Sequence, residues 1–326
     1  MNKLLLVLLS AITIVAQAET ITGAGATFPA PVYAKWASAY NAATGNQINY
    51  AAIGSGGGIK QIDGKTVDFG ATDDPRKPNE VAEKNQFQFP TVMGGVVPVI
   101  NIKGISSLVL DGKTLADIFE GKISKWNDTA IAKLNPGVAL PDIAITLVVR
   151  ADSSGTSAVF SDFLAQVSDS FKTNVGKSKT PKWGGNTTAG KGNAGVAAFM
   201  KQIPGTIGYV EYAYVKQGNL TAIDMKNKSG KIVKANAQSF SEAASGADWS
   251  VPGMAVNLNN QAEGWPITAA TFILVYTESN AKTQEVLKFF NWAFINGDDM
   301  ATELEYVPLP GAVKANIRKS WTANVK

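Results

Sequence analysis

The chain has 326 residues, a formal net charge of +4, and neither cysteine nor histidine. Disulfides, His-based metal sites and the Ser-His-Asp and Cys-His nucleophiles of many hydrolases are therefore excluded. Lysine and arginine are scattered and form no basic block, which argues against a nucleic-acid-binding protein. The length suggests about two domains.

The N-terminus has the pattern of a secretory signal. Lys3 precedes an apolar run over residues 4–15, and a cleavage site of the A-x-A type follows at 16–18. The run is too short for a membrane span, which needs ~20 residues. We expect cleavage after Ala18. Because no cysteine follows to carry a lipid, we expect a protein that is free in the periplasm of a Gram-negative cell.

Strand-like and helical segments alternate along the rest of the chain. Segments of strand character cover residues 48–53, 65–75, 90–102, 140–152, 205–215 and 268–277. Helical stretches cover residues 31–43, 115–119, 157–167, 195–202 and 284–296. Residues 226–250 are polar and are expected to include surface loops. The alternation predicts an α/β fold with largely parallel sheets.

The stretch GAGATFPAPVYAKW places small and polar residues directly before a predicted helix. Proline is tolerated in the first turn of a helix. The residues just before the prolines, Thr27 and Phe28, would therefore present N–H groups and a hydroxyl at the helix N-terminus. Gly23 and Gly25 would permit a tight approach of the backbone. An ordinary helix cap explains the same pattern.

A second junction, AAIGSGGGIKQI, places Ser55 and three glycines between a strand and a helix. It does not complete the G-x-G-x-x-G pattern, because Ile59 stands where the third glycine would fall, so no dinucleotide site is expected. A flexible turn is the alternative interpretation.

The stretch DFGATDDP brings Asp68, Asp73 and Asp74 to a strand end. An ionised carboxylate can only accept hydrogen bonds. Beside an oxyanion it fits only if that oxyanion carries a proton, as phosphate does and sulfate does not, so an acid here would reject sulfate. An acid that caps a turn is the alternative.

The third junction, RADSSGTS, follows an apolar strand and precedes a helix. Arg150 offers a fork of donors that suits a tetrahedral oxyanion, and Asp152 could pair with it and fix its orientation. Ser154 is a candidate N-cap, Gly155 permits close approach, and Thr156 adds a hydroxyl. A capped helix with a surface salt bridge is the alternative. A nucleotide phosphate loop is excluded, since G-x-x-x-x-G-K-[ST] is absent.

Three such junctions in one chain predict a ligand that is held by helix N-termini, where free N–H groups and the helix dipole attract an anion. With one well-placed arginine and no histidine, the ligand is expected to be a small oxyanion bound mostly by neutral dipoles.

These motifs, together with LDGKTLADIFEGKISKWND, GKGNAGVAAF, GTIGYVEYAY and WPITAATFILVY, resemble the periplasmic phosphate-binding proteins of phosphate-specific ABC transporters, the PstS type. The resemblance covers essentially the whole chain after the signal. It implies a two-lobed type II periplasmic-binding-protein fold, with a ligand cleft between lobes joined by two crossing strands, near residues 92–101 and 270–276. Lobe I would comprise 19–95 plus 268–326, and lobe II 96–267.

The resemblance also implies the ligand shell. Asp152 would orient the arginine, and the phosphate contacts would be Thr27, Phe28, Ser55, Asp73, Arg150, Ser154, Gly155 and Thr156. The chain departs from the familiar pattern at Gly56, where a second serine is common, and at Ser153, where glycine is common. Neither departure removes a donor, but both could change the stiffness of the loops.

The function implied is capture of inorganic phosphate and its delivery to the membrane permease subunits of the transporter, by a monomer with no catalytic residue, cofactor, metal or nucleic acid. Arsenate, which also carries a proton, would compete, whereas Asp73 would disfavour sulfate and molybdate. A secreted phosphatase with a serine nucleophile is the alternative from another class, but it lacks a histidine base. An added role as a surface adhesin stays open.

Overall fold

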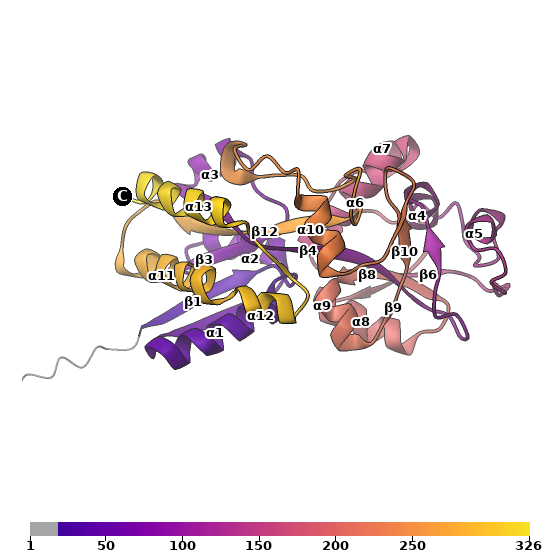
Figure 1. The fold of residues 1–326 in the computed structure, drawn as a ribbon, viewed down its shortest axis with the longest axis horizontal. Coiled ribbons are helices and arrows are strands. Elements are labelled where there is room, and N and C mark those ends of the chain that lie inside the picture. Colours follow the sequence, from indigo (N-terminus) through magenta and orange to yellow (C-terminus); the bar gives the residue numbers. More distant parts are fainter. Residues whose placement is uncertain (1–18) are drawn as a thin grey trace, which may run out of the picture.

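The structure is a computed structural model that describes residues 19–326. The predicted signal, residues 1–18, lies outside the described residues. Two α/β lobes lie side by side, and the long strand β4 (Gln86–Asn101) runs from one into the other (Figure 1). Within residues 19–326, no helix has the length and apolar character that crossing a membrane requires.

The first lobe is built on a mixed sheet. Its strands, from the outer edge inward, are β2 (Gln47–Ala52), β1 (Thr20–Gly25), β3 (Phe69–Thr72), β12 (Thr268–Tyr276) and the first part of β4, with β13 (Val307–Pro308) also paired to β4. Its helices are α1 (Ala30–Thr44), α2 (Ser55–Asp63), α3 (Pro78–Glu83), α11 (Ala281–Asn296), α12 (Asp298–Glu303) and α13 (Gly311–Asn324). Both ends of the described chain lie in this lobe (Figure 1).

The second lobe continues the same sheet from the other end of β4. Its strands are β8 (Thr206–Glu211), β6 (Thr146–Arg150), β7 (Asn186–Gly190) and β9 (Thr221–Ala222). A small second sheet contains β5 (Val109–Leu110), β10 (Asp224–Lys226) and β11 (Ile232–Val233). The helical elements of the middle of the chain are α4 (Gly112–Phe119), α5 (Thr129–Leu134), α6 (Gly155–Val167), α7 (Asp169–Asn174), α8 (Gly192–Gln202), α9 (Tyr212–Gly218), α10 (Ala237–Ala244) and η1 (Pro252–Met254).

The predicted sheet direction is only partly right. Strands β2, β1 and β3 are parallel, as are β7, β6 and β8. In the centre, however, β12 runs antiparallel to both β3 and β4, and β4 runs antiparallel to β8. The reason is topological: β4 carries the chain out of the first lobe, and its neighbours on both sides run against it.

Two connections join the lobes. Residues 86–95 of β4 pair with β12, and residues 96–101 pair with β8, so β4 belongs to both lobes. The second crossing is made just before the strand expected near 270–276. There Ile267 O accepts from Val96 N at 2.8 Å, and the Trp265 indole donates to Val96 O at 2.9 Å. Between α10 and β12 the chain passes beside the first lobe, where Gly253 lies against Gln88 of β4. It then returns to the second lobe, where Asn259 donates to Asp162 of α6 at 2.9 Å.

Each lobe has an aromatic core that holds the start of a helix in place. In the first lobe, Tyr33 of α1 packs edge-on against Tyr50 of β2, with ring centroids 5.2 Å apart. In the second, Phe160 of α6 stacks on Tyr209 at 4.3 Å, and the Tyr209 hydroxyl bonds the Ser157 hydroxyl at 2.6 Å. The first turn of α6 is thereby fixed against β8.

Candidate functional site

The three junctions predicted from the sequence meet where the lobes touch. The Gly155 N–H, at the start of α6 in the second lobe, donates to the Ser55 hydroxyl of α2 in the first lobe at 3.1 Å. Beside it, the Gly56 N–H donates to Ser153 O at 2.9 Å. The amide of Asn193 bonds the Thr27 hydroxyl, just before α1, at 2.9 Å and lies 3.3 Å from the Thr156 hydroxyl of α6. The N-termini of α1, α2 and α6 therefore converge on one buried region between the lobes.

The first junction presents N–H groups, as expected. Pro29 occupies the cap position of α1, and the helix begins at Ala30. The carbonyls of the two preceding residues are already bonded: the Tyr214 hydroxyl donates to Thr27 O at 2.7 Å, and the Tyr306 hydroxyl donates to Phe28 O at 2.6 Å. Among residues 19–326 the Phe28 N–H finds no acceptor, so it is free to bind a ligand.

Ser55 links the two lobes at the second junction. It is fully buried, and its hydroxyl oxygen accepts from Asp73 N at 3.2 Å as well as from Gly155 N. Gly54 before it has φ +91°, a left-handed conformation that favours glycine. A Cβ at Gly54 would also lie 2.1 Å from an oxygen of Asp152 in the other lobe. The loop can therefore approach the second lobe only because it lacks a side chain at this position.

Asp73 is the one acid of its stretch that lies in the site. It is 3% exposed, and its Oδ1 accepts from the Thr271 hydroxyl at 2.9 Å. Its Oδ2 has no partner among the described residues and faces Gly155, where a Cβ would lie 2.6 Å away. Burial raises the pKa of Asp73 to about 7, although the Thr271 bond and the charge of Arg150 oppose the rise.

The other two acids have different roles. Asp68 accepts from both the N–H and the hydroxyl of Thr22, at 2.7 and 2.9 Å, and so behaves as the structural acid of the alternative interpretation. Asp74 pairs across the lobes with Lys177 at 2.7 Å and Lys179 at 2.6 Å. Burial opposes ionisation of Asp74, but the two lysines outweigh it and hold its pKa below the usual value.

Arg150 ends β6 with its side chain 1% exposed. Its Nε and Nη2 donate to the two oxygens of Asp152 at 2.9 and 2.5 Å, which confirms the predicted pairing. Its Nη1 donates to the Thr156 hydroxyl at 3.3 Å. Burial opposes ionisation of Asp152, but Arg150 outweighs it and lowers the pKa of that carboxyl. Asp152 also accepts from Gly192 N at 2.9 Å, so the guanidinium is held by a fixed partner.

The start of α6 matches the predicted helix cap. Ser154 has the extended conformation of an N-cap, and its hydroxyl accepts from Ser157 N at 3.0 Å. The Thr156 N–H finds no acceptor in the described part of the chain. Gly155 is required by contact, since a Cβ there would lie 2.4 Å from the Ser55 hydroxyl oxygen. The capping interpretation is therefore correct for Ser154 but leaves the N–H of Thr156 unused.

The two departures from the familiar pattern face each other across the lobes. A Cβ placed on Gly56 would lie 2.2 Å from the hydroxyl oxygen of Ser153 and 2.4 Å from its Cβ. Real Cβ atoms do not approach that closely, so a side chain fits on one of the two residues only. Glycine on the first lobe and serine on the second therefore form one complementary exchange rather than two independent changes.

Sequence reasoning missed Asn193, which lies fully buried in the first turn of α8. Its N–H and its Nδ2 both donate to the Thr27 hydroxyl, at 3.1 and 2.9 Å, and its Nδ2 lies 3.3 Å from the Thr156 hydroxyl. The motif GKGNAGVAAF contains this residue and a fourth glycine-flanked helix start, which is the signal that could have identified it. Asn193 joins the first lobe to the second at the site.

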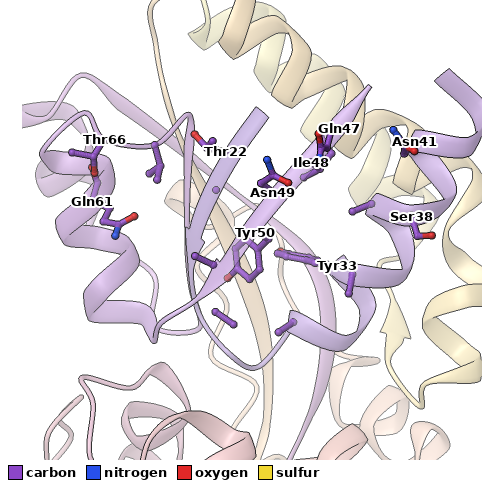
Figure 2. A pocket seen from close by; sticks show the side chains of 17 residues that line it. Thr22, Tyr33, Ser38, Asn41, Gln47, Ile48, Asn49, Tyr50, Gln61 and Thr66 are labelled. Atoms are coloured by element: carbon purple, nitrogen blue, oxygen red, sulfur yellow. The ribbon is translucent and has the colours of Figure 1, made fainter. Parts of the chain in front are cut away.

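An open groove elsewhere on the first lobe is chemically unlike this region. It lies between α1 and β2 and has a volume of about 1050 Å³. Figure 2 shows its lining, with Tyr33 and Tyr50 side by side and the amides of Asn41, Gln47 and Asn49 around them. No charged side chain lines it and no residue of the predicted ligand shell does, so it lacks what an anion requires.

The region between the lobes therefore combines many donors with an open acceptor on Asp73. The donors are a buried guanidinium and unused N–H groups at helix starts, which attract negative charge. The acceptor is the unpartnered oxygen of Asp73. Within residues 19–326, no three acidic side chains are grouped to hold a metal ion. This chemistry suits a small oxyanion that carries a proton.

Comparison with known proteins gives consistent results. Residues 13–296 match the model of a family described as the PBP superfamily domain. A phosphate-binding protein PstS of Pasteurella multocida is 51% identical over 331 aligned residues, which cover 99% of this chain and 96% of that protein. The protein of the same name from Haemophilus influenzae is 49% identical over 318 residues, which cover 95% of each chain.

Among solved structures, the phosphate-binding protein of Stenotrophomonas maltophilia superposes with a TM-score of 0.69. The superposition covers 93% of this chain and 94% of that chain, at 20% sequence identity. A likeness at this identity concerns the fold, and it agrees with the two-lobed architecture.

Proposed function

The chain belongs to the PstS family of phosphate-binding proteins, and on that premise we propose that it binds one inorganic phosphate ion between its lobes and delivers it to the membrane permease of an ABC importer. The observation that carries the proposal is the unpartnered Oδ2 of Asp73, buried among unused N–H donors. A protonated phosphate can donate to that oxygen while its other oxygens accept. The role is binding and transport, not catalysis.

The proposed contacts come from three helix starts and one strand end. N–H groups would be supplied by α1, α2 and α6, a charged fork by Arg150, and the acceptor by Asp73, while Asp152 holds the arginine in place. The full proposed set is Thr27, Phe28, Ser55, Asp73, Arg150, Ser154, Gly155 and Thr156.

Ligand choice follows from the unpartnered acceptor on Asp73. Arsenate carries a proton at neutral pH like phosphate and is expected to compete. Sulfate has no proton to donate and would place an unpaired acid against an anion. We therefore expect phosphate and arsenate to bind and sulfate to be rejected.

Lobe closure is the proposed binding motion. Lobe I comprises residues 19–95 plus 268–326 and lobe II residues 96–267, and the ligand would be enclosed as they meet, which strengthens each dipole contact by excluding water. The contacts from Ser55 to Gly155 and from Asp74 to the two lysines would then form on closure. We propose that the protein works as a monomer in the periplasm after removal of residues 1–18.

The test is a phosphate titration of the ligand-stripped protein by calorimetry, with arsenate and sulfate run alongside. One-to-one binding of phosphate, competition by arsenate and silence toward sulfate are the expected results. No binding of phosphate would overturn the proposal. Hydrolysis of a chromogenic phosphate ester, measured on the same sample, would indicate the phosphatase alternative instead.

The contact between Gly56 and Ser153 makes a separate prediction about closure. Gly56→Ser is expected to weaken phosphate binding about fivefold to a hundredfold, because overpacking at a tight contact costs ~1–3 kcal/mol. Ser153→Gly alone should change the affinity little. The double variant should regain most of the wild-type affinity, since the side chain then sits on the other lobe. Calorimetry on the four proteins checks this, and a double variant no better than Gly56→Ser would contradict it.

A further inference from the structure

Three hydroxyl groups of the proposed phosphate shell already accept two N–H hydrogen bonds each. Thr27 accepts from the N–H and the Nδ2 of Asn193, at 3.1 and 2.9 Å. Ser55 accepts from the N–H of Asp73 at 3.2 Å and from that of Gly155 at 3.1 Å. The third hydroxyl, on Thr156, accepts from a guanidinium N–H and from the same asparagine amide, both at 3.3 Å.

This pattern determines whether each hydroxyl donates to a ligand or accepts from it. A serine or threonine hydroxyl has one hydrogen to donate and two lone pairs that accept. When N–H donors occupy both lone pairs, the hydroxyl can serve a ligand only by donating its hydrogen. All three groups are thereby fixed as donors, and the unpartnered Oδ2 of Asp73 is left as the open acceptor among them.

Asn193 supports two of these three hydroxyls, one in each lobe. Its orientation follows from its other contact, because Oδ1 accepts from the Glu211 N–H at 3.1 Å and so Nδ2 must face the threonines. The side chain is fully buried, so water does not replace these bonds. The hydroxyl of Thr27 lies in the first lobe and Asn193 in the second, so this hydroxyl is oriented only when the lobes are together.

We propose that Asn193 is a positioning residue for the ligand: it turns the hydroxyls of Thr27 and Thr156 into obligate donors to the oxyanion, and that of Thr27 only in the closed form. The inference rests on the proposed phosphate site. It assigns to α8 a part in ligand recognition, through two threonines and without direct contact with phosphate.

A double-mutant cycle tests this role by calorimetric titration with phosphate. Asn193→Ala is expected to raise the Kd about tenfold or more, the effect of losing hydrogen bonds that prepare a charged contact. In a background of Thr27→Val and Thr156→Val, which removes both hydroxyls at nearly constant shape, the same change is expected to raise the Kd less than about twofold. An equal factor in both backgrounds, or no effect in the wild type, would overturn the proposal.

Asn135 supplies a matched control. It is a buried asparagine of the same lobe whose side chain bonds only backbone groups, donating to Val109 O at 2.8 Å and Ile131 O at 2.9 Å and accepting from Val109 N at 2.7 Å. Asn135→Ala should lower the unfolding temperature and leave the phosphate Kd unchanged. An equal rise in Kd for both alanine variants would reduce Asn193 to a structural role.

Asn193→Asp gives a second measurement should the alanine variant fail to fold. The ionised carboxylate accepts but cannot donate, so the threonine hydroxyls would turn toward it and away from the ligand. Relative to wild type at each pH, its phosphate affinity should recover as the pH falls and the new carboxyl regains a hydrogen. A constant ratio across pH would contradict the proposal. If the wild type itself fails to bind phosphate, the proposed function falls, whereas a binding wild type with an additive cycle removes only the role of Asn193.

Discussion

Phosphate binding by an Arg150→Ala variant is expected to be weaker by about 2–5 kcal/mol, or roughly thirtyfold to several thousandfold in Kd. The guanidinium is buried and bonded to both oxygens of Asp152, so its removal deletes charged donors and leaves that carboxylate without its partner in a half-buried position. The site, which also contains the buried Asp73, then loses the buried positive side chain that opposes the charge of the ligand. Calorimetric titration of the purified variant measures the effect.

Two further variants make the result specific. Arg150→Lys keeps the charge but loses the planar fork that bonds Asp152 and Thr156 together, and an affinity between those of the wild type and the alanine variant is expected. Arg76→Ala is the matched control, because Arg76 makes the same kind of two-pronged pair with Asp63, at 2.8 and 2.5 Å, outside the site. Arg76→Ala should lower the stability of the fold and leave the phosphate affinity unchanged. Unchanged phosphate affinity in Arg150→Ala would remove this residue from the site.

Asp73→Asn is expected to change the choice of ligand. An amide nitrogen that donates would replace Oδ2. Sulfate would then receive a hydrogen bond in place of the repulsion from an unpaired carboxylate. Protonated phosphate would lose the acceptor for its hydrogen. Hydrogen bonds to charged groups contribute ~1.5–3 kcal/mol, so the ratio of phosphate to sulfate affinity should fall by about a hundredfold or more. Competition titrations with the two anions measure that ratio, and an unchanged ratio would contradict the assignment.

The raised pKa of Asp73 should make the sulfate affinity of the wild type depend on pH. Since the pKa is about 7 in the folded protein, the carboxyl is neutral and able to donate below pH 7 and ionised above it. Sulfate, which does not titrate in this range, should therefore bind the wild type better as the pH falls from 8 to 6. The Asn variant should show no such gain. Any pH dependence that survives in it would point to Glu211, the other buried carboxyl whose pKa burial raises.

Asp74→Asn is the control for this pair of experiments. Asp74 neighbours Asp73 in the sequence but bonds Lys177 and Lys179 across the lobes. Its replacement should reduce the affinity for every anion through weaker closure, more so at low salt, where ion pairs are less screened. The ratio between phosphate and sulfate should not change. If Asp74→Asn lost the discrimination between phosphate and sulfate, the acid that selects the ligand would be Asp74 and not Asp73.

The parts of the site that sequence reasoning found are local ones. Ser154 caps α6, and Arg150 pairs with Asp152 two residues on, because both features depend on a few neighbouring residues and on ordinary helix and strand geometry. The choice of Asp73 over Asp68 and Asp74 came from family resemblance, since spacing alone treats the three acids alike. The structure separates them by burial and by partner.

What the sequence could not show depends on contacts between distant segments. Asn193 bonds Thr27 across 166 residues, and nothing in either stretch reveals the distance between them. The antiparallel centre of the sheet was also missed, because alternating strands and helices are typical of parallel sheets and say nothing about a strand shared by two lobes. Gly56 and Ser153 each show one departure within their own stretch, and only the contact between the lobes makes them a matched pair.

The contact between Gly56 and Ser153 limits which lobes of related proteins could be combined in one chain. A chimera that joined this second lobe, with Ser153, to a first lobe with serine at position 56 would place two side chains in the space of one. Each half would keep every donor, and yet the two lobes would close less readily. The compatible unit of exchange in such a chimera would therefore be the matched pair of loops rather than the lobe.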